Sequence, residues 1–298
     1  MMPSDDAEPL CRFILSSNYR RKQAVARDGS YNVRMILRSD DVDIFYEVRG
    51  QGPDVILLHP YPSDHRYWHP LAPFLVSRWR LVLPDLRGLG RSGAGEGPTT
   101  MEKLAQDLLR LCDAMRIGRA VFVGCSVGGY ALFEFWRRSR ERVKALVLMD
   151  TKAGLDSGEA RAGRLKNAEE VLQKGPEWAI DQMMPRLLAP VTVSSRLDLV
   201  EQAKQTMQQC TAAGMAAMQR GMAARSDSVP TLAEIDVPTL VLGGEDDAPS
   251  PVGELEAIVR GIRGAELKIV RRAGHFAAFE QPEEVGRLVR EFLERHGR

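Results

Sequence analysis

The chain has 298 residues, of which 44% are hydrophobic and 27% are charged, a composition that is typical of folded globular proteins and argues against disorder. Lysine plus arginine number 41 and aspartate plus glutamate number 40, so the formal net charge is only +1. This balance leaves no basic surplus to neutralise phosphates, and we expect no nucleic acid partner. No apolar run approaches the ~20 residues that span a bilayer, so we expect no membrane span.

The four cysteines, Cys11, Cys112, Cys125 and Cys210, are scattered without the paired spacing of a metal site. Buried thiols in a reducing compartment are the simplest account of this pattern. The N-terminus also lacks the basic start and long apolar core of a secretory signal. We therefore expect a cytoplasmic protein that uses neither a metal ion nor a cofactor.

Residues 1–30 are polar and show no periodicity, which predicts a flexible N-terminal extension. Two strand-like runs follow, Val33–Leu37 and Val42–Val48, and they meet at the polar segment of residues 39–41. A polar, aspartate-rich break between two short apolar runs is typical of a hairpin turn. The pattern therefore predicts an antiparallel pair of strands at the start of the folded region.

The next apolar runs do not alternate with polar residues, which is typical of strands buried on both faces of a parallel sheet. Helix-length segments separate several of them, such as Thr100–Met115, in which leucines recur at helical spacing. Alternating strands and helices predict an α/β fold with a mostly parallel central sheet flanked by helices. The runs are Val55–Leu58, Leu81–Leu83, Val121–Val123, Ala145–Leu148, Thr239–Leu242 and Leu267–Val270.

One interval, residues 152–230, lacks a strand run and has the pattern of several helices, and it is too long for a plain crossover. We predict an inserted helical cap here, over the carboxyl ends of the strands, with residues 31–151 and 231–298 forming the core. Helix packing explains any single methionine of this interval, but together the methionines favour an apolar, adaptable lid. They are Met183, Met184, Met207, Met215, Met218 and Met222.

A glycine-rich segment, Gly124–Gly129, links the strand run Val121–Val123 to a predicted helix over Tyr130–Arg138. It has the pattern G-x-S-x-G with Ser126 at its centre. The glycines permit a sharp strand-to-helix turn, which lifts the serine hydroxyl clear of the sheet and places it near a helix N-terminus. We predict that Ser126 is a nucleophile. The thiol of Cys125 is the weaker candidate, because its side chain would point away into the packing.

A serine hydroxyl is a poor nucleophile while it keeps its proton, and it needs a histidine to accept that proton. His275 lies in a loop after the last strand run and before the helical segment Pro282–Leu293. Loops at the carboxyl ends of parallel strands meet at one edge of the sheet, where Ser126 is also expected. We therefore predict that His275 is the base. The other histidines are His59, His65, His69 and His296.

The base needs an acid that holds its imidazole in the correct tautomer and stabilises its charged form. Carboxylates occupy residues 245–247, directly after the strand run Thr239–Leu242. Asp247 suits the role best, because it is nearest to the proline-rich turn that would direct a side chain back over the sheet edge. Asp246 is the direct competitor, and Asp150, at the end of an earlier run, is a more remote one.

Five motifs in this order resemble those of the α/β-hydrolase superfamily, over the chain from about residue 33 to its end. Within the superfamily the chain looks most like the branch of small carboxylesterases, 3-oxoadipate enol-lactonases and haloperoxidase-like perhydrolases. The resemblance implies the α/β-hydrolase fold and catalytic residues in the order Ser, Asp, His. Ser126 disfavours epoxide hydrolases and haloalkane dehalogenases, which have aspartate at that position. The motifs are Leu57–Pro62, Asp85–Ser92, Gly124–Gly129, Gly244–Asp247 and Gly274–Phe276.

The resemblance also implies the two backbone amides that form the oxyanion hole. One belongs to Val127, at the start of the helix that follows the nucleophile. The other belongs to the residue after the family's His-Gly pair, which is Tyr61 here. This chain has His59-Pro60 in place of His-Gly, and proline fixes one backbone angle, so we expect a different loop path. We interpret His59 as a brace for this loop.

These residues predict a serine hydrolase that cleaves a carboxylic ester with a small-to-medium acyl group through an acyl-enzyme. Its expected partner is a small-molecule ester or lactone. Lactone opening, perhydrolysis and C–C bond hydrolysis use the same triad and are the alternative reactions. Two alternatives come from other classes: a hydrolase-fold receptor with little turnover, and an interaction protein that uses the N-terminal extension.

Overall fold

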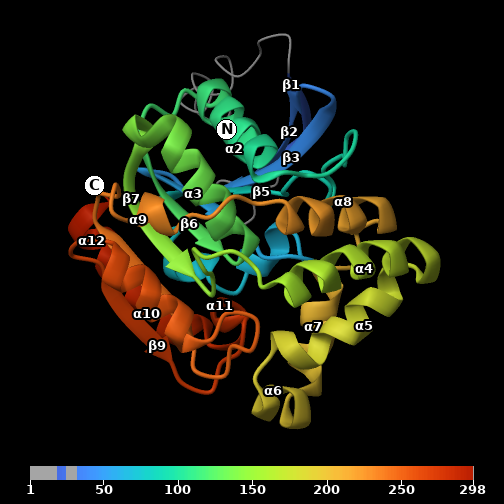
Figure 1. Ribbon diagram of the computed structural model, residues 1–298. Helices are drawn as coiled ribbons and strands as arrows, with labels where there is room; N and C mark the ends of the chain where they lie inside the picture. Colours follow the sequence, from blue (N-terminus) through green and yellow to red (C-terminus); the bar gives the residue numbers. More distant parts are fainter. Residues whose placement is uncertain (1–18, 25–31, 298) are drawn as a thin grey trace.

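The computed structural model describes residues 19–24 and 32–297, and one sheet runs through its centre (Figure 1). The sheet has nine strands in the order β1-β2-β3-β5-β4-β6-β7-β8-β9. Strands β1, β2, β3 and β5 pair antiparallel, and from β5 to β9 all neighbours are parallel. The strands are β1 (Tyr19–Ala24), β2 (Asn32–Ser39), β3 (Val42–Arg49), β4 (Asp54–Leu58), β5 (Arg80–Pro84), β6 (Ala120–Cys125), β7 (Val143–Met149), β8 (Thr239–Gly244) and β9 (Glu266–Val270).

The predicted strands are confirmed. The unalternating apolar runs form β4 to β9, and the predicted hairpin is the antiparallel pair β2 and β3. In β6 every residue is buried, as expected for a strand that is covered on both faces. Strand β9 is partly exposed because it lies at the edge of the sheet. Three cysteines, Cys112, Cys125 and Cys210, are free and buried, and Cys11 lies outside the described residues.

The first strand lies where the sequence pattern predicts a flexible extension. Residues Tyr19–Ala24 form β1, which pairs antiparallel with β2 and has a register shift between Arg21 and Gln23. The rest of the expected extension, residues 1–18 and 25–30, lies outside the described part of the chain. The segment YRRKQA has no apolar alternation, so its pattern predicts no strand. Its pairing uses main-chain groups, which every residue of this segment offers.

Helices flank the sheet as predicted. The Thr100 side chain accepts a hydrogen bond from the Lys103 amide and so begins α2, whose buried face includes Leu104, Leu108 and Leu111. Helix α3 follows β6 directly, and α12 contacts β7 and β9. No helix in the described part of the chain is long and apolar enough to cross a membrane. These elements are α2 (Met101–Ala114), α3 (Val127–Ser139), α10 (Val252–Gly261), α11 (Ala277–Glu280) and α12 (Pro282–His296), with short 3-10 helices η2 (His65–Trp68), η3 (Ala72–Phe74) and η4 (Arg140–Arg142).

A group of helices is inserted between β7 and β8, and we call it the cap. Figure 1 shows α4 to α8 gathered at one side of the molecule, and α4 packs along α8. Five of the six methionines of this region are buried, and Met183 is partly buried. Methionine therefore serves chiefly to pack the cap helices. The inserted helices are α4 (Gly158–Lys174), α5 (Pro176–Leu187), α6 (Pro190–Ser195), α7 (Leu197–Gln205), α8 (Ala212–Ala223) and α9 (Val229–Leu232).

The cap rests on the core through close backbone contacts of α8. Gly214 lies against the carbonyl oxygen of Gly88, and Gly221 lies against that of Thr99, so a Cβ added to either helix glycine would overlap an oxygen. The Thr99 amide also donates a hydrogen bond to the Ala217 carbonyl oxygen at 2.9 Å. Only a residue without a side chain lets a helix approach another backbone this closely. These contacts hold the cap on the segment that follows β5.

Replacing Gly221 by alanine is therefore expected to lower the free energy of unfolding by about 1–3 kcal/mol, because the new methyl group collides with the Thr99 carbonyl oxygen. Urea unfolding followed by circular dichroism measures this change. Gly253→Ala in α10 is the matched control, since its Cβ meets nothing within 4 Å. The control should be neutral or stabilising by up to ~1 kcal/mol. Equal stability of the two variants would contradict the close contact.

Candidate active site

Ser126 lies at the sharp turn between β6 and α3. Its backbone has φ of 54° and ψ of −114°, a strained conformation for a residue with a side chain. The Ser126 amide donates to the Met149 carbonyl oxygen at 2.9 Å, and the Thr151 hydroxyl donates to the Ser126 carbonyl oxygen at 2.8 Å. These two hydrogen bonds hold the backbone of Ser126 at both its amide and its carbonyl oxygen. The strained angle therefore persists, and the hydroxyl projects away from the sheet.

Close packing requires the glycines of this turn. A Cβ on Gly128 would overlap the Leu58 carbonyl oxygen and lie 2.9 Å from the Leu58 Cβ. A Cβ on Gly124 would lie 2.7 Å from the Gly128 carbonyl carbon. Helix α3 could therefore not begin beside β4 if either residue carried a side chain. The spacing of the G-x-S-x-G pattern reflects the close approach of β4, β6 and the first turn of α3.

Three side chains from different turns and loops meet above the strand ends. His275 Nε2 lies 2.8 Å from Ser126 Oγ, and His275 Nδ1 lies 2.9 Å from both carboxylate oxygens of Asp247. An ionised carboxylate only accepts hydrogen bonds, which assigns the imidazole proton to Nδ1 and leaves Nε2 free to accept from the serine hydroxyl. All three residues are nearly buried, with at most 7% exposed. The structure brings together the three residues that the sequence analysis selects.

The weaker candidates are placed differently. Asp246 is exposed, and its amide donates to the Ala273 carbonyl oxygen, while the next side chain, that of Asp247, turns inward. The Cys125 sulfur is buried 3.4 Å from the Tyr67 hydroxyl oxygen, and burial raises the pKa of this thiol well above its ordinary value. A thiol that keeps its proton is a poor nucleophile, so the geometry favours Ser126 over its neighbour.

Asp150, the remaining acid candidate, is fully buried directly after β7. Its Oδ1 accepts a hydrogen bond from the Gly244 amide at 2.8 Å, and its carboxyl group is hydrogen-bonded to Asp247. Burial and the negative charge of Asp247 raise the pKa of Asp150 well above its ordinary value. Asp150 therefore keeps its proton and donates to Asp247. Its place in the sequence makes Asp150 only a substitute candidate for Asp247, and its role as a hydrogen-bond partner of Asp247 follows from burial in the fold.

The two candidate oxyanion donors come from different parts of the chain. Val127 is the first residue of α3, so its amide has no acceptor within the helix. Tyr61 follows Pro60 in a loop that His59 braces: His59 Nδ1 donates to the Pro60 carbonyl oxygen, and Nε2 accepts from the Leu86 amide, each at 2.9 Å. Burial lowers the pKa of His59 and keeps it neutral, as one donor and one acceptor require. His59 is thus a structural residue, as expected.

A buried carboxyl group that the sequence analysis misses holds the loop of His275. Glu280 accepts hydrogen bonds from the Gly274 amide at 2.7 Å and from the Ala189 amide at 2.9 Å. Because Gly274 precedes His275 and Ala189 precedes α6, one side chain ties the histidine loop to the cap. Burial raises the pKa of Glu280. A single acid at the end of the apolar segment Ala277–Glu280 is the sequence signal that could have identified it.

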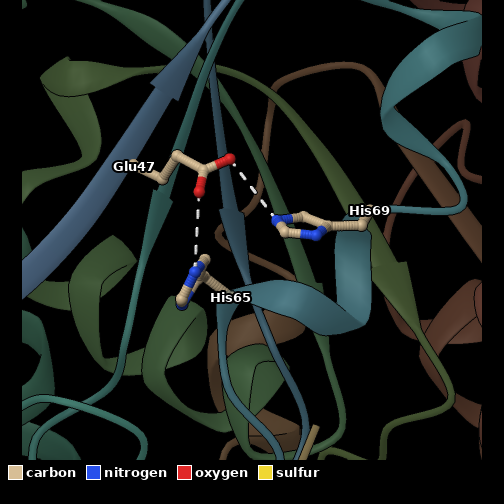
Figure 2. Close-up of side chains that lie close together, drawn as sticks. All are labelled: Glu47, His65 and His69. Carbon is tan, nitrogen blue, oxygen red and sulfur yellow. Dashed lines mark ion pairs between the residues drawn. The ribbon is translucent and has the colours of Figure 1, made fainter. Parts of the chain in front are cut away.

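Figure 2 shows a second cluster, in which Glu47 of β3 has its carboxylate oxygens 3.6 Å from His65 Nε2 and 3.4 Å from His69 Nε2. These groups are of the types that bind metal ions, and they lie close enough to share one. However, Arg49 contacts both Glu47 and His69, so a guanidinium group stands beside the candidate ligand atoms. Burial raises the pKa of Glu47, but His69 and Arg49 lower it to about 2. His65 Nδ1 also lies 2.7 Å from Asp85 Oδ1. We therefore interpret the cluster as a structural network of charged side chains.

A cavity of about 620 Å³ opens between the core and the cap. Tyr61 and Pro249 line it from the core, and Pro249 follows Asp247 by two residues. Leu187 also lines it, and its carbonyl oxygen accepts a hydrogen bond at 3.0 Å from the amide of Phe276, the residue after His275. The cavity therefore lies next to the loops that carry Asp247 and His275, although neither side chain lines it. Their composition differs from the apolar one that the methionines favour, because many lining side chains are charged or amides: Lys152, Asp156, Glu159, Arg164, Arg186 and Gln219.

The raised pKa of Asp150 makes stability depend on pH. The unfolded chain loses this proton near its ordinary pKa while the folded protein keeps it, so this residue's contribution to stability falls as pH rises, by about 1.4 kcal/mol per pH unit. Asp150→Asn carries a permanently neutral group of the same shape, so its free energy of unfolding relative to that of the wild type should rise as pH increases above the ordinary aspartate pKa, by up to about 1.4 kcal/mol per pH unit. Urea unfolding at several pH values measures the difference. Asp236→Asn, an exposed site, is the control, and a wild-type slope in Asp150→Asn would contradict the assignment.

Comparisons with known proteins agree with the observed fold. The family model described as alpha/beta hydrolase fold matches residues 53–282. The structure of a thermophilic esterase from Thermogutta terrifontis, with malate bound, has a TM-score of 0.83 and 36% identity and covers 94% of this chain and 99% of its own.

Two sequence relatives extend the comparison. The 3-oxoadipate enol-lactonase 2 of Acinetobacter baylyi is 25% identical over 267 residues, which are 89% of this chain and 98% of that protein. The 2-hydroxy-6-oxononadienedioate/2-hydroxy-6-oxononatrienedioate hydrolase of Paraburkholderia xenovorans is 29% identical over 274 residues, 88% of this chain and 94% of that protein. With a matching family model over most of its length, the chain belongs to the α/β-hydrolase family and is a hydrolase.

Proposed function

We propose that this hydrolase cleaves a carboxylic ester through a covalent acyl-enzyme, with Ser126, His275 and Asp247 as its catalytic triad. The observation that carries the proposal is the pair of contacts made by His275, 2.8 Å to Ser126 Oγ and 2.9 Å to Asp247. This arrangement lets one imidazole accept the hydroxyl proton while a carboxylate stabilises the charge that forms. The strained backbone of Ser126 supports the same role, because such strain clusters at functional sites.

The reaction proceeds in two halves. Ser126 Oγ attacks the acyl carbon while His275 Nε2 takes its proton, and the imidazolium then gives this proton to the departing alcohol. Water next attacks the acyl-enzyme with His275 as the base, which releases the acid and restores the serine. The amides of Tyr61 and Val127 hold the oxyanion of each tetrahedral intermediate, and each donor contributes about a hundredfold or more in rate.

Lactones are the second candidate substrate class. Opening a lactone follows the same steps, but the alcohol stays attached to the acyl group. The similarity to 3-oxoadipate enol-lactonase 2 over 89% of the chain supports lactones, and the 36% identity to an esterase supports simple esters. C–C bond hydrolysis and perhydrolysis use the same triad, so substrate tests have to separate these reactions.

Ser126→Ala is expected to lower kcat by about a thousandfold or more, because the nucleophile is lost. Asp247→Asn should lower kcat by about 10⁴-fold, because an amide holds the imidazole in the wrong tautomer. Asp246→Asn is the matched control, the same change on the adjacent exposed side chain, and it should keep the wild-type rate. Initial rates on 4-nitrophenyl esters of increasing acyl length measure these effects, with circular dichroism to check folding.

The outcomes separate the candidate functions. Turnover of esters that disappears in Ser126→Ala supports the esterase. Wild-type activity in that variant would show that another group is the nucleophile. Turnover of lactones alone would favour the lactonase. Folded wild-type protein that binds esters without hydrolysing them would favour the receptor.

A further inference from the structure

Three positively charged side chains surround one carboxylate in the wall of the cavity. Asp156, in the loop before α4, lies 2.6 Å from Arg164 Nε, 2.6 Å from Arg225 Nη1 and 3.2 Å from Lys152 Nζ. We call these four residues the cationic cluster. Since one anion faces three cations, the cluster has a surplus of two positive charges.

The cationic cluster is largely withdrawn from water. The side chains of Asp156 and Arg225 are 3% and 4% exposed, and those of Lys152 and Arg164 are 16% and 21% exposed. Burial raises the pKa of Asp156, but hydrogen bonds from Arg225 and Arg164 lower it well below its ordinary value, so this carboxylate is ionised and fully engaged. Buried charge that no opposite charge balances is costly. The surplus therefore favours the binding of a second anion.

Two members of the cluster, Arg164 and Lys152, face the cavity with donors to spare. Arg164 uses Nε for Asp156, and its Nη1 lies 3.4 Å from both Gln219 Oε1 and the Met222 sulfur, so among the described residues its Nη2 hydrogens are left for a further acceptor. Lys152 has three ammonium hydrogens, and its Nζ lies 3.2 Å from one Asp156 oxygen. Both side chains can therefore bind a further acceptor that enters the cavity.

Arg225 has a different position. Its Nη groups donate to Asp156 and to the carbonyl oxygens of Met222 and Gly154, and its guanidinium lies 4.5 Å from the centre of the Tyr130 ring. Tyr130 belongs to α3, the helix that begins at the nucleophile, so Arg225 fixes the cluster to the catalytic side of the core. Two further charges at the rim of the cavity, Arg186 and Glu159, are exposed and of opposite sign. They leave the surplus unchanged.

We propose that the substrate carries a carboxylate in addition to the acyl group that is cleaved, and that Arg164 and Lys152 bind this carboxylate in the cavity. The inference rests on the proposed function, because it assigns the far end of the same substrate. A planar guanidinium edge and an ammonium group offer donors to the two oxygens of a carboxylate. A neutral ester of similar length leaves the positive surplus unbalanced, so the enzyme should distinguish the two by charge.

Two pairs of esters test this preference. The mono-4-nitrophenyl esters of glutaric and adipic acid carry a free carboxylate, and 4-nitrophenyl hexanoate and heptanoate are neutral esters of similar length. We expect kcat/KM of the wild type to be about 10- to 100-fold higher for the charged esters. Arg164→Gln should lower this charged-to-neutral ratio about tenfold. Lys152→Gln, at the end of the same cluster, should lower it as well and serves as the second variant if the first does not fold.

Lys166→Gln is the matched control, since it removes one positive charge from an exposed side chain of the same helix, α4, and should leave the ratio unchanged. A binding experiment makes the test independent of turnover. Titration calorimetry of glutarate into Ser126→Ala protein should detect binding. The double variant with Arg164→Gln should bind glutarate about tenfold more weakly, whereas the double variant with Lys166→Gln should bind it as tightly as Ser126→Ala does.

The two proposals fail in different ways. If folded Ser126→Ala protein binds no glutarate, or if the ratio is unaffected by Arg164→Gln and Lys152→Gln, the carboxylate site is wrong, while ester turnover keeps the proposed function. If glutarate binding depends on Arg164 but no ester or lactone is hydrolysed, the carboxylate site stands and the proposed function is wrong. Inorganic phosphate that binds more tightly than glutarate would overturn the assignment of a carboxylate.

Discussion

The candidate site depends on one tight turn, at which β6 passes into α3 with Ser126 at a φ of 54°. The close approach of Leu58 in β4 excludes a side chain at Gly128, so the helix starts against the sheet and the serine side chain is directed outward. Parallel strands then end at the same edge, which brings the loops that follow β8 and β9 to this serine. The distances around His275 are a consequence of sheet topology and of this turn.

The buried carboxyl groups near Ser126 and His275 have different environments and therefore different chemistry. Asp247 faces an imidazole N–H and acts as the acceptor that orients it. Asp150, fully buried beside that carboxylate, keeps its proton and donates. Glu280 accepts backbone amides and joins the histidine loop to the cap. Identical functional groups thus serve as orienting base, neutral donor and structural link, because burial and neighbouring charge set the protonation of each.

The cap combines apolar packing with a charged cavity wall. Its methionines lie between helices, whereas Lys152, Arg164 and Arg225 converge on Asp156 at the cavity. Composition of the interval alone therefore misleads about the cavity wall, because it counts side chains without showing which of them face the cavity. Glycines of α8 let this helix lie directly on the core, so the cavity wall has a defined position relative to Ser126.

The sequence by itself determined strands β2 to β9, the hairpin, the serine turn and the identity of the three residues that meet there, because each leaves a local signal in apolar runs, glycines or loop position. It did not determine β1, whose pairing depends only on main-chain groups. Nor did it determine the proton on Asp150 or the cationic cluster, in which Asp156 meets Arg225 from 69 residues away. Only the tertiary structure decided these, because protonation and charge balance depend on burial and on neighbours distant in the chain.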